Sequence, residues 1–170
     1  MGKVQNHFTP GGPGTVTRSI DDIIISVRNA SGGDIPFGAP VFLGVNGAVP
    51  FDMEEPQDFT TFLGFAVRVA DKTPDAYPQG QFNQGDEAGQ RGAWKSGDVM
   101  EVLVRGSIAL KTSDYGARGG RLYIRKTDGE ITSMAGTSGT TVLLENVRIR
   151  NPRTSYAQCC EAVVRTRNII

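Results

Sequence analysis

The sequence predicts an all-β fold: a small β-barrel or sandwich of short antiparallel strands with an extended N-terminal arm. Its 170 residues include 22 glycines and 9 prolines, a composition typical of a chain rich in turns. Short runs of β-branched and aromatic residues are separated by clusters of Gly, Asn, Asp and Pro. No segment of any length shows the apolar period of an amphipathic helix. We therefore expect roughly eight to ten strands.

The arm is expected to cover residues 1–18, and a single β-barrel-like domain residues 19–170. Residues 10–14 read PGGPG, and the whole arm has almost no apolar periodicity. Such a segment has no packed core of its own.

Four strands are expected in the first half of the domain. They are IIISV (23–27), APVFLG (39–44), AVPF (48–51) and TTFLGFAVRVAD (60–71). The Asn46-Gly47 pair predicts a hairpin with a type I′ turn, whose two central residues both need positive φ. Residues 72–93 contain too many Pro and Gly residues for a simple hairpin, so we expect a long irregular loop that forms a contact surface.

The second half begins with WKSGDVMEVLVRGSIALKTS, residues 94–113. After a polar turn, a uniformly apolar face alternates with a mixed face that carries Glu101 and Arg105. Gly106 is expected to be a bend or bulge in this strand. The remaining expected strands are RLYIRK (121–126), EITSM (130–134), TVLLENVRIR (141–150) and QCCEAVVRTRNI (158–169).

Two smaller features of this half also carry expectations. The Asp128-Gly129 pair predicts a second type I′ turn. The adjacent Cys159 and Cys160 are awkward to bridge, so we expect reduced thiols, one buried and one facing outward, with an intermolecular disulfide as the alternative.

Few of the residues that catalytic or metal sites need are present together. The one histidine, His7, lies in the arm, which disfavours a Ser-His-Asp or Cys-His site. The sequence has no Cys/His set for zinc, no calcium loop and no phosphate-binding glycine motif. Asp98 and Glu101 resemble a glycosidase pair only weakly, since Asp98 is better interpreted as a turn residue. We expect no enzyme, no cofactor and no metal.

The charges balance, with 18 Lys plus Arg and 18 Asp plus Glu, which argues against a general coat on nucleic acid or on a membrane. No apolar run approaches the length of a membrane span. Arginines do cluster around residues 118–126 and along the C-terminal strands, at Arg148, Arg150, Arg153, Arg165 and Arg167. Because aromatic platforms are sparse there, we expect pairing with acidic loops across an interface, with solvated strand faces as the alternative.

Several motifs follow one another in a recognisable order. They are Ile35 to Gly38 (IPFG), Gly64 to Ala66 in FLGFA, Gly97-Asp98, Gly106, and Gly120 to Ile124. In this order, over about residues 30–150, the chain resembles the capsid cement (head decoration) proteins of tailed bacteriophages. The loop between Tyr77 and Trp94 is longer than the linkage expected for that family.

The resemblance implies a structural protein of the virion, without catalysis, made in the host bacterial cytoplasm. Such proteins bind the outer surface of the expanded capsid and cement contacts between major capsid proteins. A homotrimer at local three-folds is expected, with a dimer at two-folds as the alternative; neither a membrane nor nucleic acid is an expected direct partner. Other readings are a different virion module, such as a head fibre or tail piece, a carbohydrate-binding sandwich, or an enzyme.

Expected contact residues follow from this reading. In the arm they are Val4, His7, Phe8, Val16 and Arg18, and in the long loop they are Tyr77, Phe82 and Trp94. The three loop residues would be the stacking residues of a carbohydrate-binding module. For pairing between subunits we expect Glu101, Arg105 and Arg121.

Overall fold

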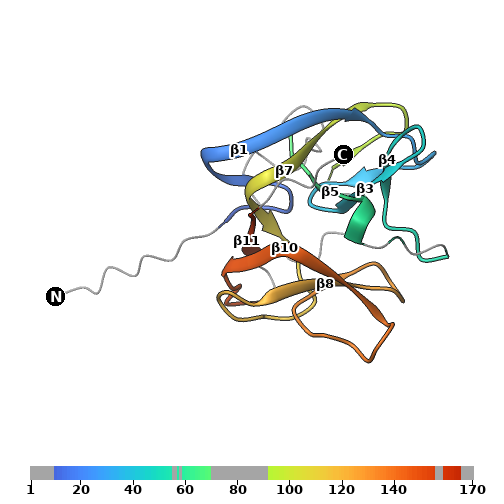
Figure 1. The fold of residues 1–170 in the computed structure, drawn as a ribbon. Helices are drawn as coiled ribbons and strands as arrows, with labels where there is room; N and C mark the ends of the chain where they lie inside the picture. The colour runs from blue at the N-terminus through green and yellow to red at the C-terminus, as the bar shows by residue number, and fades with distance from the viewer. Residues whose placement is uncertain (1–9, 55–56, 58, 70–91, 156–158, 166–170) are drawn as a thin grey trace.

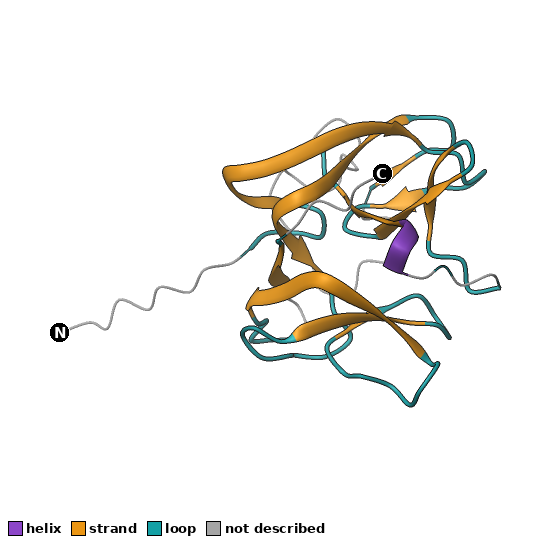
Figure 2. Cartoon of the chain, in the orientation of Figure 1, coloured by secondary structure: helices purple, strands orange, loops and turns teal. Residues whose placement is uncertain are grey.

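The computed structural model describes residues 10–54, 57, 59–69, 92–155 and 159–165. Strands dominate these residues and no α-helix is among them, which confirms the all-β prediction (Figure 2). One 3₁₀ turn, η1 (Phe59–Thr61), precedes β5. None of the described segments is a helix long and apolar enough to cross a membrane.

Nine strands of the described residues form one curled antiparallel sheet (Figure 1). Its order is β4 (Gly47–Pro50), β3 (Pro40–Gly44), β5 (Phe62–Ala66), β7 (Val99–Leu110), β11 (Cys160–Val164), β10 (Thr141–Asn151), β8 (Arg121–Arg125) and β9 (Ile131–Thr132), with β1 (Val16–Arg28) also paired to β7. A second sheet pairs β2 (Ile35–Pro36) with β6 (Ala93–Trp94). Strands β1, β7 and β10, of 13, 12 and 11 residues, are longer than expected.

Strand β7 holds the two halves of the large sheet together. Its first half pairs with β5, and its second half, from Gly106 to Leu110, pairs with β11. Strand β1 pairs with β7 at both ends, but its register breaks between Arg18 and Ile23. The expected irregularity is therefore in β1, opposite Gly106, where a Cβ would collide with the Asp22 carboxylate. β7 itself continues through Gly106 with φ of +126°.

The sheet has a hydrophobic core on each face. The larger core includes Phe62, whose ring centroid lies 5.6 Å from that of Phe42 and 5.3 Å from that of Phe65. The smaller core includes Ile35 and Trp94. In β7, Val102 and Val104 lie in the smaller core and Leu103 between them lies in the larger core, so this part of the strand is buried on both faces. The expectation of a single apolar face was too simple, because β1 and β6 cover the other side.

Residues 10–18 belong to the packed fold, contrary to the expectation that they form part of the arm. The Gly14 N–H donates to the Ala109 carbonyl at 2.9 Å, and the Arg68 N–H donates to the Gly14 carbonyl at 2.8 Å. A Cβ at Gly14 would lie 2.8 Å from the Ala66 carbonyl oxygen. The glycines permit this close backbone approach, so residues 10–18 are part of the packed domain.

Both expected hairpins form, but neither turn is type I′. Gly44 pairs with Gly47, so Val45 and Asn46 are the turn residues of β3–β4. Of the described residues, only glycines have positive φ, among them Gly47 (144°) and Gly129 (70°). Each glycine thus follows the turn as the one left-handed residue, and the Asn or Asp before it keeps an ordinary negative φ.

Both cysteines are buried as thiols, so the expectation that one faces outward was wrong. Cys160 begins β11 and its side chain packs in the larger core, and Cys159 is 2% exposed. Burial raises the pKa of the Cys160 thiol to about 12, against weaker opposing effects from Thr112 and Arg153. The thiol is therefore a small apolar core group at neutral pH.

Candidate functional site

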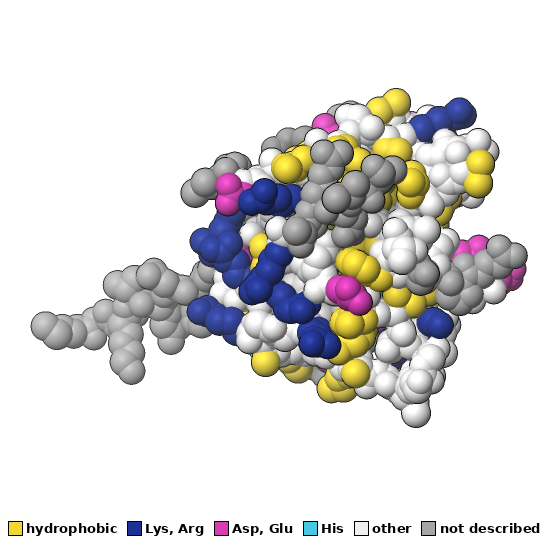
Figure 3. Space-filling view, viewed as in Figure 1, with side chains coloured by type: hydrophobic (Ala, Val, Ile, Leu, Met, Phe, Trp, Pro, Cys, Tyr) yellow, Lys and Arg dark blue, Asp and Glu magenta, His cyan; other side chains and the backbone are white. Residues whose placement is uncertain are grey.

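Five arginines from separate segments meet where β1, β7, β10 and β11 come together. We call this surface the arginine face: Arg18, Arg105, Arg118, Arg150 and Arg165. Figure 3 shows Lys and Arg side chains gathered over this side of the molecule. The face is formed by residues distant in sequence that the sheet order brings together.

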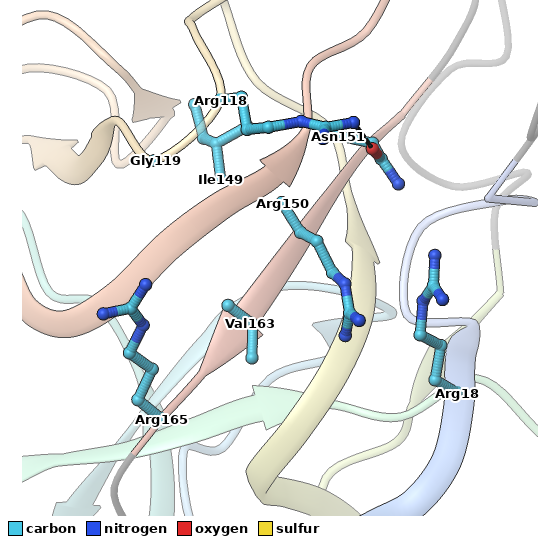
Figure 4. A pocket seen from close by; sticks show the side chains of 8 residues that line it. All are labelled: Arg18, Arg118, Gly119, Ile149, Arg150, Asn151, Val163 and Arg165. Atoms are coloured by element: carbon cyan, nitrogen blue, oxygen red, sulfur yellow. Dashed lines mark hydrogen bonds between the residues drawn. The ribbon is translucent and has the colours of Figure 1, made fainter.

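Two adjoining hollows shape the arginine face. The first, of about 470 Å³, is lined by Arg18, Arg118, Arg150 and Arg165, with Val163 among its apolar residues (Figure 4). The second, of about 380 Å³, shares three of these arginines and adds Arg105, Asp21 and Asp22. The surface is therefore concave and basic, with an acidic border on one side.

Strand periodicity explains how β10 presents its arginine. Val147 and Ile149 are buried in the larger core, and Arg150 between Ile149 and Asn151 is exposed. The Arg150 Nη1 donates to the Ser107 Oγ at 3.3 Å. Across the first hollow, Arg118 Nη2 donates to Asn151 Oδ1 at 2.9 Å, as the dashed line in Figure 4 shows.

A buried carboxylate lies beneath the arginine face. The Glu161 side chain is 0% exposed, and its Oε1 accepts hydrogen bonds from Arg18 Nε at 2.7 Å and Thr17 Oγ1 at 2.9 Å. The Asn151 side-chain amide also donates to Glu161. Burial alone would raise the pKa of Glu161, but these hydrogen bonds and the Arg18 charge outweigh it, so the pKa is lowered. The ionised Glu161 thus joins β1, β10 and β11.

Positive charge prevails on the arginine face. Arg105, Arg118, Arg150 and Arg165 form no ion pair with any described residue, whereas Arg18 is paired with Glu161. At the acidic border, burial is the main cause that raises the pKa of Asp22, although its carboxylate accepts a hydrogen bond from the Ser107 N–H. The face therefore carries more guanidinium groups than carboxylates to pair with them.

Other arginines of the predicted clusters lie elsewhere. Arg125 forms ion pairs with Asp128 at 3.0 Å and with Glu130 at 2.7 Å, within its own hairpin. Arg153 is buried, 5.0 Å from the centroid of the Tyr115 ring. Arg148 Nη1 donates to the carbonyl oxygens of Glu145 and Val147. The basic clusters of the sequence thus divide into neutralised, buried and exposed members.

The structure places the expected contact residues unevenly. Val4, His7, Phe8, Tyr77 and Phe82 lie outside the described residues. Val16 packs against the larger core, and Arg18 lies on the arginine face. Both belong to β1 rather than to an arm.

Trp94 requires a correction. It is 4% exposed, its Nε1–H donates to the Val67 carbonyl at 2.9 Å, and its ring meets Phe37 edge-on at 6.3 Å. These contacts make it a residue of the smaller core. It is therefore unavailable for a surface contact or for stacking on a sugar.

The three residues expected to pair subunits separate in space. Arg105 is exposed and lies on the arginine face, where it lines the second hollow. Arg121 is exposed at the start of β8, and Glu101 is half-buried on β7. Glu101 and Arg105 form no ion pair with each other in the described fold.

Sequence reasoning missed Glu161 and the roles of Arg118 and Arg165 around the first hollow. A charged residue inside the apolar run CCEAVV was an available signal for a buried ion pair. The partner Arg18 could not be identified from it, because 143 residues separate the two. Among the described residues, no group of three or more His, Cys, Asp or Glu could hold a metal ion.

Comparisons with known proteins give a consistent picture. The family model described as "Structural cement protein (E217 gp24/Pam3 gp6)" matches residues 2–164. The structure is also similar to a chain of the solved structure "The capsid of Myoviridae Phage XM1", with a TM-score of 0.64 and 14% identity over 96% of each chain. At that identity the likeness concerns the fold. No curated protein matches the chain.

Proposed function

Because the chain belongs to the phage structural cement protein family, and is thus a structural virion protein that stabilises the capsid, we propose that it binds the outer surface of the expanded shell. There it bridges neighbouring major capsid proteins and takes no part in catalysis. The observation that carries the proposal is the family match over residues 2–164, which spans nearly the whole described fold.

The fold supports a cementing role in mechanical terms. A shell-stabilising protein has to keep its shape under load, and here one sheet is packed by a hydrophobic core on each face. The buried Glu161 fastens the start of β1 to β10 and β11. A rigid body of this kind transmits force between the surfaces that it joins.

Bridging requires contacts with more than one shell subunit. Residues 1–9, with Val4, His7 and Phe8, are proposed to contact one shell subunit by strand addition to an exposed sheet edge. The segment with Tyr77 and Phe82 is proposed to contact a neighbouring subunit. The carbohydrate-binding alternative loses one of its three expected stacking residues, since Trp94 is buried.

Self-association is part of the proposal. Exposed Arg121 and half-buried Glu101 are proposed to pair between copies in a homotrimer at local three-folds, with a dimer at two-folds as the alternative. We also propose that the chain is made in the host bacterial cytoplasm before it assembles onto the shell. Light scattering of the purified chain and of decorated shells measures the stoichiometry, and a monomer in both would contradict this part.

Co-sedimentation with purified shells tests the main proposal. We expect the full chain to bind expanded shells, to leave unexpanded shells undecorated, and to raise the temperature at which expanded shells rupture. Deletion of residues 1–9 should weaken binding without unfolding the chain, because it leaves in place the backbone hydrogen bonds that Gly14 forms with Ala109 and Arg68. Equal binding to both kinds of shell, or to neither, would contradict the proposal.

A further inference from the structure

We propose that the arginine face is the surface that docks onto the shell, and that its occupant is an acidic segment of the major capsid protein. The inference rests on the proposed function and names the contact that this function requires. It is carried by the juxtaposition, around two adjoining hollows, of four arginines that have no ion-pair partner among the described residues.

The hollows can receive side chains of a partner. Their volumes are about 470 and 380 Å³, and Arg18, Arg150 and Arg165 line both. Since one water molecule occupies about 30 Å³, each hollow has room for a side chain with part of its hydration. Because the two hollows share these three arginines, they form one site with two parts.

The charges around the hollows select a carboxylate. A guanidinium group offers parallel N–H donors that match the two oxygens of Asp or Glu. Glu161 lies beneath the face and binds Arg18, but Arg105, Arg150 and Arg165 have no acid of the described fold as an ion-pair partner. In a chain whose net charge is zero, this local excess is the kind of patch that steers an acidic partner.

The remaining lining residues favour a protein segment over nucleic acid. Among the residues that the structure describes, no aromatic side chain lines either hollow, so these residues offer bases no stacking platform. Val163 contributes to both hollows, and Ile149 to the first, so that apolar side chains can also be received. Asp21 and Asp22 border the second hollow and would repel a continuous phosphate backbone, whereas a protein segment can place a donor beside them.

A charge-reversal experiment tests this assignment. The full chain, the double variant Arg150→Glu/Arg165→Glu and the matched control Arg125→Glu are bound to expanded shells at low, intermediate and high salt. Arg125 is a suitable control because its own hairpin already neutralises it. We expect the double variant to bind at least about tenfold more weakly with a flatter salt dependence, and the control to stay within about twofold. Circular dichroism checks that each variant is folded, and Arg165→Gln replaces the double variant if it is not.

Competition with the unmodified chain identifies the occupant. A polyglutamate peptide should displace the chain from shells at lower concentration than a DNA oligonucleotide of equal charge. Stronger competition by DNA would overturn the inference. So would a double variant that retains shell binding but loses self-association, since the face would then belong to a second copy.

The failure of this inference differs from the failure of the proposed function. If the unmodified chain binds expanded shells and the double variant binds them equally at every salt concentration, the arginine face is not the docking surface but the cementing role stands. If the unmodified chain binds no shells at all, the proposed function fails and the inference falls with it.

Discussion

Arg125 and Arg150 lie on the paired strands β8 and β10, yet their surroundings are opposite. Arg125 has Asp128 and Glu130 as ion-pair partners from its own hairpin. Arg150 donates to the Ser107 hydroxyl and shares a hollow with Arg18 and Arg165. The density of arginine in a sequence therefore does not identify a contact surface. The presence or absence of local acids distinguishes a neutralised hairpin from an open basic face.

The acids that pair with Arg18 and Arg125 also differ in their exposure to solvent. Arg18–Glu161 and Arg125–Glu130 have the same shortest N–O distance of 2.7 Å. The Glu161 side chain is 0% exposed and that of Glu130 is 58% exposed. One acid is a buried part of the architecture and the other is solvated, so equal distances conceal unequal contributions to stability.

The largest expected difference in stability is between substitutions of two glycines, Gly106 beside the arginine face and Gly129 in the hairpin of Arg125. Gly106→Ala should lower the free energy of unfolding by about 3 kcal/mol, because the new Cβ would collide with Asp22 and φ is +126°. Gly129→Ala in the hairpin should cost about 1 kcal/mol, since its Cβ would meet only Phe51 Cδ1 at 3.7 Å and the positive φ remains. Urea unfolding measures both, and equal losses would contradict the packing described at Gly106.

The next difference compares the two carboxylates. Glu161→Gln should lower the free energy of unfolding by about 2 kcal/mol, since it removes the charge from a buried group with several donors. Glu130→Gln should change it by less than about 0.5 kcal/mol, as expected for an exposed ion pair. If the two substitutions proved equally mild, Glu161 would not organise the arginine face.

Acid titration sharpens this comparison. The folded-state pKa of Glu161 is lowered, so its stabilisation is present above the ordinary pKa and is lost as pH falls through the folded value. The raised pKa of Asp22 has the opposite sign, since its neutral form is favoured in the fold. We expect Glu161→Gln to flatten the loss of stability in acid. Thermal unfolding between neutral pH and the acid range checks this, and parallel curves for the unmodified chain and the variant would refute it.

The smallest effect is expected at Arg125. Arg125→Gln should change the free energy of unfolding by less than about 0.5 kcal/mol, because an exposed ion pair contributes little. A loss well above that, in the same urea experiment, would mean that the hairpin is part of the structural framework. The contrast with the region around Glu161 would then disappear.

Local patterns in the sequence were sufficient to predict much of this fold. The β-branched runs and the turn residues lead to most of the strands, among them TVLLENVRIR. The order of the family motifs led to the cement proteins, which the family match confirms. These features depend on residues close together in the chain.

Features that depend on contacts between residues far apart in the sequence could not be predicted. Arg18, Arg105, Arg118 and Arg165 converge only because β1 and β11 both pair with β7, and no local pattern contains that order. Trp94 was expected to be a contact residue of the long loop. Its pairing opposite Ile35 instead places it in the smaller core. Residues 10–18 pack against Gly38, Ala66 and Ala109, which are remote in sequence. No local pattern shows these contacts, so the sequence alone led to their assignment to the arm.

A density map of expanded shells decorated with the full chain tests the central claim most directly. We expect the chain to sit on the outer surface with its arginine face toward the shell, and with carboxylates of the major capsid protein within ion-pair distance of Arg150 and Arg165. The neutralised hairpin around Arg125 should lie outside this contact. A map in which the arginine face points to solvent, or contacts only another copy of the chain, would contradict the account.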